Sequence, residues 1–206
     1  MPKKIACLLA ACFLTGCSTY ADQNISGIKA TGSVLDKHVS NFCQHASYAT
    51  KDGVYRGGAV LSHLMGFWQY GQQVSQVRFT SLSEDEFSTE YLDKQLNVLG
   101  ARRFSRGEDY QVENDGSLEI KVSSRCGSGG GPGLGCTSSK IRIFTDQTGN
   151  LAVIQATGGA GIAGIVPVAS SASYLSLFPP ITRTDDSSPG ALANCPASKS
   201  ANVPKS

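Results

Sequence analysis

The sequence predicts a mostly β protein with some α-helix (α+β): an antiparallel meander of about six strands, covered by one or two N-terminal helices. Three observations support this fold class. From residue 75 onward, apolar and polar residues alternate with a period of two, as in half-buried strands. Turn-forming residues recur about every ten positions, which leaves no room for the crossover helices that parallel strands require. Before residue 75, apolar residues recur at helical spacing.

Two segments ahead of the meander are expected to be helical. The first is residues 34–48, where Ser33 and Asp36 resemble a capping box at the start of the helix. Its apolar residues at helical spacing are Leu35, Val39, Phe42 and Ala46. The second is residues 59–70, although Gly66 disfavours a continuous helix there.

The strands that follow are expected to be short and joined by tight turns. The expected strands are residues 75–81, 87–91, 97–104, 110–113, 118–123, 140–145 and 151–156. Asp115 and Gly116 form a strong hairpin signal between two of them. After that turn Leu118 and Ile120 are expected to face the core, because they alternate with charged residues.

Residues 158–178 are rich in Gly, Ala, Ser, Ile and Val, and no charge occurs within residues 147–182. The length would allow a membrane span, but the glycines, serines and Pro167 argue against one. We expect this segment to pack against the sheet, and contact with lipid or an apolar partner stays open. Residues 183–206 read as a flexible C-terminal tail.

The N-terminus carries the features of an export signal. Lys3 and Lys4 precede an apolar run at residues 5–14, about half the length of a spanning helix. The run ends Leu14-Thr15-Gly16-Cys17, which resembles the lipobox of bacterial lipoproteins. The resemblance implies that the chain is cut before Cys17 and that this cysteine is lipidated. The alternative is an ordinary secretory signal that contains a cysteine by chance.

The same resemblance implies a location. The residue after the lipidated cysteine helps to sort lipoproteins, and here it is Ser18 and not the Asp that favours retention in the inner membrane. This implies a lipid anchor in the outer membrane, facing the periplasm. The expected organisation is a signal peptide at 1–16, a lipidated tether at 17–32, a single domain at 33–182 and the tail at 183–206.

Cysteine usage fits an exported protein. Cys7 and Cys12 belong to the signal, so four cysteines remain besides the lipidation site: Cys43, Cys126, Cys136 and Cys195. An even number in an oxidising compartment predicts two disulfides, for which three connectivities exist. We favour Cys126–Cys136, which would restrain a glycine-rich loop, together with Cys43–Cys195. Free thiols are the alternative.

Several chemistries are disfavoured. Removal of Lys3 and Lys4 takes the 18 basic residues to 16, equal to the 16 acidic ones, so a basic nucleic-acid surface is not expected. The G-x-G-x-x-G at residues 159–164 lacks the helix of a dinucleotide site, because Pro167 follows it. His38, Cys43 and His45 lack a fourth metal ligand. No catalytic, cofactor-binding or metal-binding residue is therefore predicted, and no cofactor.

The expected function is a non-enzymatic structural, assembly or partner-binding role in the cell envelope. The expected partners are the membrane, through the lipid, and an envelope protein or an apolar ligand. The first rival is a periplasmic carrier, whose cavity would be lined by Phe79, Tyr91 and Ile120. The second rival is an envelope hydrolase in which His63 meets a serine or an acid, although no G-x-S-x-G motif occurs.

Overall fold

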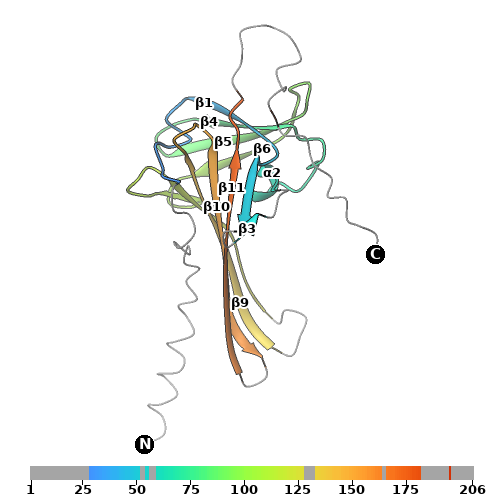
Figure 1. Cartoon of the computed structure of the whole chain (residues 1–206), viewed down its shortest axis with the longest axis vertical. Coiled ribbons are helices and arrows are strands. Elements are labelled where there is room, and N and C mark those ends of the chain that lie inside the picture. Colours follow the sequence, from blue (N-terminus) through green and yellow to red (C-terminus); the bar gives the residue numbers. More distant parts are fainter. Residues whose placement is uncertain are drawn as a thin grey trace, which may run out of the picture.

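Two antiparallel sheets form the fold, and four long strands of one of them project well beyond the other (Figure 1). The structure is a computed structural model that describes residues 28–51, 54–55, 59–127, 133–163, 166–181 and Cys195. The mostly β, antiparallel class predicted from the sequence is confirmed within these residues.

The smaller sheet has four strands in the order β1-β4-β5-β6. Their bounds are Val39–Cys43 for β1, Gln76–Ser81 for β4, Glu86–Leu92 for β5 and Val98–Ser105 for β6. The last three form a meander, as the alternating pattern predicts. In β5, buried Phe87, Thr89 and Tyr91 alternate with partly exposed neighbours, so one face of this sheet enters the core.

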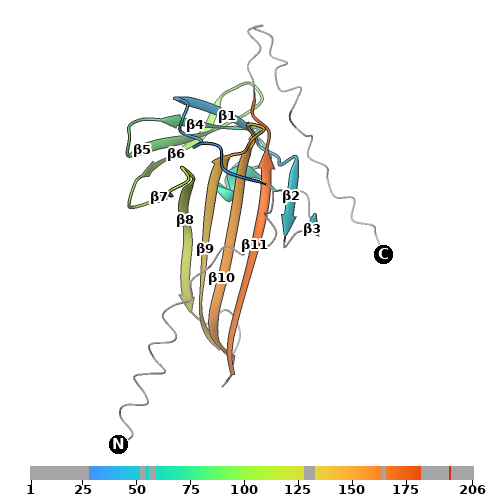
Figure 2. The same cartoon turned by 60° about the vertical axis from the view of Figure 1, so that its left-hand side comes forward.

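The larger sheet has seven strands in the order β3-β2-β11-β10-β9-β8-β7. The short strands are Val54–Tyr55 (β3), Tyr48–Lys51 (β2) and Tyr110–Val112 (β7). The long ones are Leu118–Gly127 (β8), Gly133–Thr145 (β9), Leu151–Ala163 (β10) and Val166–Phe178 (β11). Figure 2 shows that the strands of the smaller sheet run across the upper end of these long strands.

The main core lies between the two sheets. Aromatic residues of the smaller sheet meet aliphatic residues at the upper end of the larger one, and its fully buried members include Phe79, Phe87, Tyr91, Phe104, Leu118, Ile141 and Leu151. A second cluster occupies the other face of the larger sheet, where Phe144, Ile154 and Leu175 pack beneath Ile28 and Ala30. We call the smaller sheet, together with the part of the larger sheet that carries these two clusters, the body.

The predicted helix at residues 34–48 is wrong. Ser33 and Asp36 do bond to each other, but they close a tight turn: the Ser33 amide donates to the Asp36 carboxylate at 2.7 Å. The chain then continues as β1, which pairs with β4 from Val39 to Cys43. Pairing with a neighbouring strand satisfies the backbone and buries Phe42, so tertiary contacts override the helical spacing.

The predicted helix at residues 59–70 is reduced to a single turn. Helix α2 spans only Leu61–Leu64 and stops before Gly66, whose φ of 82° is incompatible with continuing a right-handed helix. Leu61 and Met65 enter the core from this turn. The sheet is therefore covered by a second sheet, and the expected helical cover is wrong.

The strands expected between residues 75 and 156 are present within a residue or two, apart from β8, β9 and β10, which are longer. The hairpin turn at Asp115 and Gly116 is also present, and Gly116 has a φ of 80°. The main difference concerns residues 158–178, which form the outer half of β10 and all of β11. They belong to the sheet instead of packing against it.

Candidate interaction surface

The outer halves of the four long strands form a projection that we call the distal blade. It consists of residues 123–127 of β8, 133–139 of β9, 157–163 of β10 and 166–172 of β11. In Figures 1 and 2 these strands extend away from the body toward one end of the molecule. Strands β9, β10 and β11 have 13 residues each, which corresponds to about 44 Å of extended chain.

Cross-strand register divides the four strands into rows. Near the body, one row contains Leu118, Ile143, Val153 and Ser176, and the apolar residues in it are buried. The first row of the distal blade contains Ser123, Ser139, Thr157 and Ala172. The change from large apolar to small residues occurs at this point, so the strands continue after the core has ended.

Small and uncharged residues dominate the distal blade. Its described strands contain one charged residue, Arg125, and their inner positions are mainly Gly, Ser, Ala and Thr. Backbones approach closely there: a Cβ added at Gly135 would lie 3.2 Å from the Ala160 carbonyl oxygen. Where the side chains of the distal blade are described, at residues 135–139, 157–161 and 169–172, no residue belongs to either hydrophobic cluster. Folding of the body therefore does not account for this element.

Charged side chains join β8 and the turn before it to β9 on the body side of the blade. Lys140 of β9 lies 2.9 Å from Glu119 of β8, and Arg142 pairs with Asp115 and donates to the Ser117 hydroxyl at 2.7 Å. Burial alone would raise the pKa of Asp115, but hydrogen bonds from Ser117 and the Arg142 guanidinium lower it on balance. These ion pairs hold β8 and the turn before it against β9 within the body.

The cysteine positions fall into three groups. Cys17 lies outside the described residues, so its lipidation stays a prediction. Cys43 is buried and joined to Cys195, with Cα atoms 5.4 Å apart, in the pairing that the sequence analysis favours. Cys126 and Cys136 occupy one row of the distal blade, and Cys136 takes part in a disulfide. The pairing of Cys126 with Cys136 stays a prediction.

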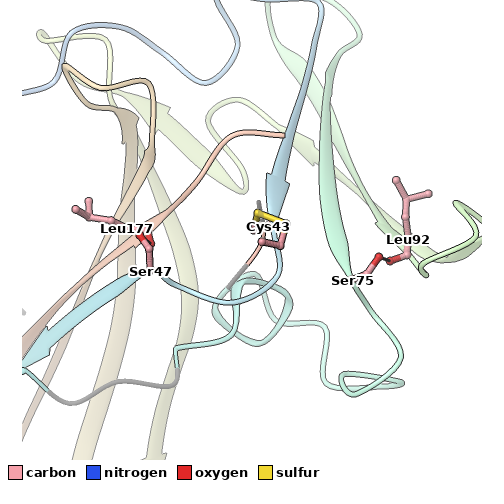
Figure 3. Close-up of a disulfide and its surroundings, with 6 residues drawn as sticks. Cys43, Ser47, Ser75, Leu92 and Leu177 are labelled. Carbon is pink, nitrogen blue, oxygen red and sulfur yellow. Dashed lines mark hydrogen bonds between the residues drawn. A yellow bond between two sulfur atoms is a disulfide. The ribbon is translucent and has the colours of Figure 1, made fainter. Parts of the chain in front are cut away.

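Two serines secure the chain near Cys43. Figure 3 shows Ser47 and Ser75 near this cysteine. Their hydroxyls donate to the carbonyl oxygens of Leu177 and Leu92, each at 3.2 Å. Cys43 sits at the end of β1, so the bond to Cys195 holds part of the C-terminal region against the body.

His63 occupies an aromatic surface and lacks the surroundings of a catalytic base. It stacks on Trp68 with ring centroids 4.7 Å apart, and the neighbouring Ser62 hydroxyl accepts a hydrogen bond from Gln44. Among the described residues, no hydrogen bond joins His63 to a serine or an acid. His45 has a lowered pKa because of burial and, secondarily, the nearby His63.

No metal cluster is present in the described part of the chain, where no three His, Cys, Asp or Glu residues converge. Cys43 is in the disulfide, and so cannot join His38 and His45 in a site. The G-x-G-x-x-G at residues 159–164 also differs from a dinucleotide site, since Gly159 and Gly161 lie within strand β10. Gly159 and Gly161 therefore belong to the distal blade.

The expected cavity residues are packed into the core. Phe79 lies edge-on to Phe42, with centroids 5.8 Å apart, and Tyr91 stacks on Phe67 at 4.1 Å. Ile120 is 2% exposed. A groove of about 420 Å³ exists elsewhere, between the segment after Thr31, the β9–β10 turn around Asp146, and Pro180. These contacts do not favour the carrier hypothesis.

Sequence reasoning missed the distal blade and one exposed aromatic pair. Trp68 and Tyr70 are 72% and 50% exposed, whereas Phe67 of the same segment packs on Tyr91. Aromatic residues more often lie in the core, and the sequence does not distinguish the two exposed rings from the buried one. The sequence did contain a signal for the blade: residues 158–178 are uncharged and mostly small, so they can bury little apolar surface in a core.

The described residues contain no helix long and apolar enough to cross a membrane. Comparison with known protein families, curated proteins and solved structures finds no match to this chain. The candidate functional element is therefore identified by its geometry alone: a projecting, small-residue extension of the larger sheet.

Proposed function

We propose that this protein is a lipid-anchored envelope protein with a non-enzymatic role, and that its distal blade binds an envelope partner. The observation that carries the proposal is that the blade projects past both hydrophobic clusters. A segment whose described side chains belong to neither cluster, and which still forms regular strands, requires another reason for its sequence. Binding at an exposed sheet is such a reason.

The exposure of the blade supports this role. Ala169, Ser170 and Ser171 are exposed on β11, and Thr137 is exposed on β9. Small side chains leave the backbone accessible, so main-chain hydrogen bonding to a partner is sterically unhindered. Nothing in the charge distribution of the blade favours a polyanion, because Arg125 is its one charged residue in the described strands.

The lipid anchor defines where such contacts occur. Eleven peptide steps separate Cys17 from Ile28, the first described residue, and they span at most about 40 Å. That reach is similar to the length of the long strands. Lipidation at Cys17 would thus keep the body near the membrane surface and within reach of other anchored or membrane-embedded proteins.

Site-specific photocrosslinking in intact cells tests the proposal. A photoreactive residue placed at Ser170 is expected to form adducts with envelope proteins after irradiation. The matched control is Glu84, an exposed residue in the β4–β5 turn on the body. Adducts at Glu84 together with none at Ser170 would overturn the assignment of the blade as the binding element.

A further inference from the structure

The edges of the smaller sheet are protected. On the outer side of β1, the Cys43 amide donates to the Pro179 carbonyl at 3.0 Å, and the Ile181 amide donates to Asn41 at 2.8 Å. The other edge, β6, carries Arg102 and Arg103. Covered edges and charged edges are two common ways in which proteins prevent strands from pairing with another chain.

The larger sheet is protected only near the body. Its edge strands there, β3 and β7, are two and three residues long. Beyond β7, the Lys121 amide still donates to the Asp109 carbonyl at 3.1 Å. Among the described residues, no strand lies on the outer side of β8 at residues 123–127 or of β11 at residues 166–172.

These two open edges run in opposite directions. The order β8-β9-β10-β11 contains four strands in antiparallel succession, so β8 runs from body to tip and β11 runs from tip to body. If β11 of one copy lies beside β8 of the next, the antiparallel alternation continues and both bodies lie at the same end. Two β11 edges paired in antiparallel would place the bodies at opposite ends.

We propose that the partner of the distal blade is a second copy of this chain, with the β11 edge of one copy pairing with the β8 edge of the next. This inference rests on the proposed function, because anchoring in one membrane keeps the bodies on one side. The contact is head-to-tail, so an assembly of any size keeps one open β8 edge at one end and one open β11 edge at the other, where further copies can add. The blades then form one sheet shared among copies.

The sequence of the two edges fits this pairing. Residues 166–172 of β11 contain no charge, and residues 123–127 of β8 contain only Arg125, so no like charges oppose each other. Pro167 lacks an amide hydrogen, which limits pairing near the tip. Residues 168–172 are left for the contact. With rows aligned across the interface, Ala172 of one copy lies opposite Ser123 of the next.

Disulfide trapping tests the arrangement in the full-length, lipidated protein in its own envelope. Ser123→Cys and Ala172→Cys are introduced in separate, differently tagged copies that are expressed together and mildly oxidised. A mixed dimer is expected, and a chain carrying both substitutions is expected to form a ladder of covalent oligomers.

Two further variants define the register and the control. Ser170→Cys replaces Ala172→Cys to detect an interface shifted by two residues, and a mixed dimer from either variant supports the proposal. Ala101→Cys on the charged edge strand β6 is the matched control and is expected to form no disulfide-linked dimer. Dimers between identical variants, or no dimer at any blade position, would overturn the head-to-tail arrangement.

A charge variant supplies a measurement that does not depend on cysteine chemistry. Ser171→Lys places a cation on the uncharged β11 edge, whereas Ser171→Thr keeps an uncharged strand-forming residue. In detergent, the mass of the wild type and of Ser171→Thr is expected to be oligomeric, and that of Ser171→Lys monomeric. A monomeric wild type would overturn the inference.

The two proposals fail separately. If photoreactive Ser170 forms adducts only with other proteins and no mixed dimer forms, partner binding by the blade stands and self-assembly is wrong. If Ser170 forms no adducts at all, binding by the blade is wrong and self-assembly fails with it.

Discussion

Phe87 and Phe104 face each other across strands β5 and β6, with nearly parallel rings whose centroids lie 4.6 Å apart. Phe87 also meets the edge of Tyr110 at 5.0 Å. Because β5 and β6 belong to the smaller sheet and Tyr110 to the larger one, this aromatic group joins the two sheets. It is the centre of the body's packing.

Replacing Phe87 with alanine is expected to lower the free energy of unfolding by about 3–5 kcal/mol, because the side chain is fully buried and leaves a cavity. Urea denaturation followed by circular dichroism measures the change. Val98→Ala is the control, since Val98 is 53% exposed and its truncation should change stability by less than about 0.5 kcal/mol. Equal losses in both variants would contradict this account of the core.

The Cys43–Cys195 bond is expected to stabilise the body, since it closes a long loop with a sequence separation of 152 residues. Cys195→Ser should lower the free energy of unfolding by about 2–5 kcal/mol. Non-reducing peptide mapping of the mature protein should recover Cys43 and Cys195 in one linked pair of peptides. Four alkylatable thiols in the denatured, unreduced protein would show that no disulfide exists.

The stability of the body is expected to fall in mildly acidic solution because of His45. Its lowered pKa means that, below its ordinary value of 6.5, the unfolded chain binds protons more readily than the folded one. Stability is therefore lost as the pH falls through 6.5 toward the folded-state pKa. Thermal midpoints measured between about pH 8 and pH 5 should decrease more for the wild type than for His45→Gln. Identical pH profiles would refute this assignment.

Lipidation is expected to depend on Cys17 alone. Cys17→Ala should accumulate as an uncleaved precursor that incorporates no labelled palmitate and loses its lipid anchor. Cys12→Ala, a substitution within the apolar run of the signal, is the matched control and should be processed normally. Normal labelling of Cys17→Ala would refute the lipobox assignment.

The sequence predicted those strands in which one face is buried. In β5 and β8, large apolar residues alternate with polar ones, because each strand separates a core from solvent. Strand β1 lacks that signal, since Phe42 and Cys43 are adjacent and both buried while Val39 is 42% exposed. Its apolar residues happen to match helical spacing, and only pairing with β4 distinguishes the two structures.

The distal blade was not predictable from periodicity. Rows such as Ser123, Ser139, Thr157 and Ala172 contain only small residues, so no alternation of large apolar and polar residues develops there. The strands continue beyond the body because the backbone pairing of the body rows extends into the rows of the blade. The sequence indicated this element only as an uncharged segment of small residues, which we expected to pack against the sheet.

The pairing of β2 with β11 and of β1 with residues 179–181 has a consequence for the order of events during biosynthesis. A chain made from its N-terminus releases β1 and β2 first. Strand β2 pairs with β11, the last described strand, and β1, which pairs with β4 on one side, bonds on its other side to the segment after β11. The body therefore cannot close until nearly the whole chain has emerged. Premature stops anywhere before residue 181 should leave the early strands open to proteases.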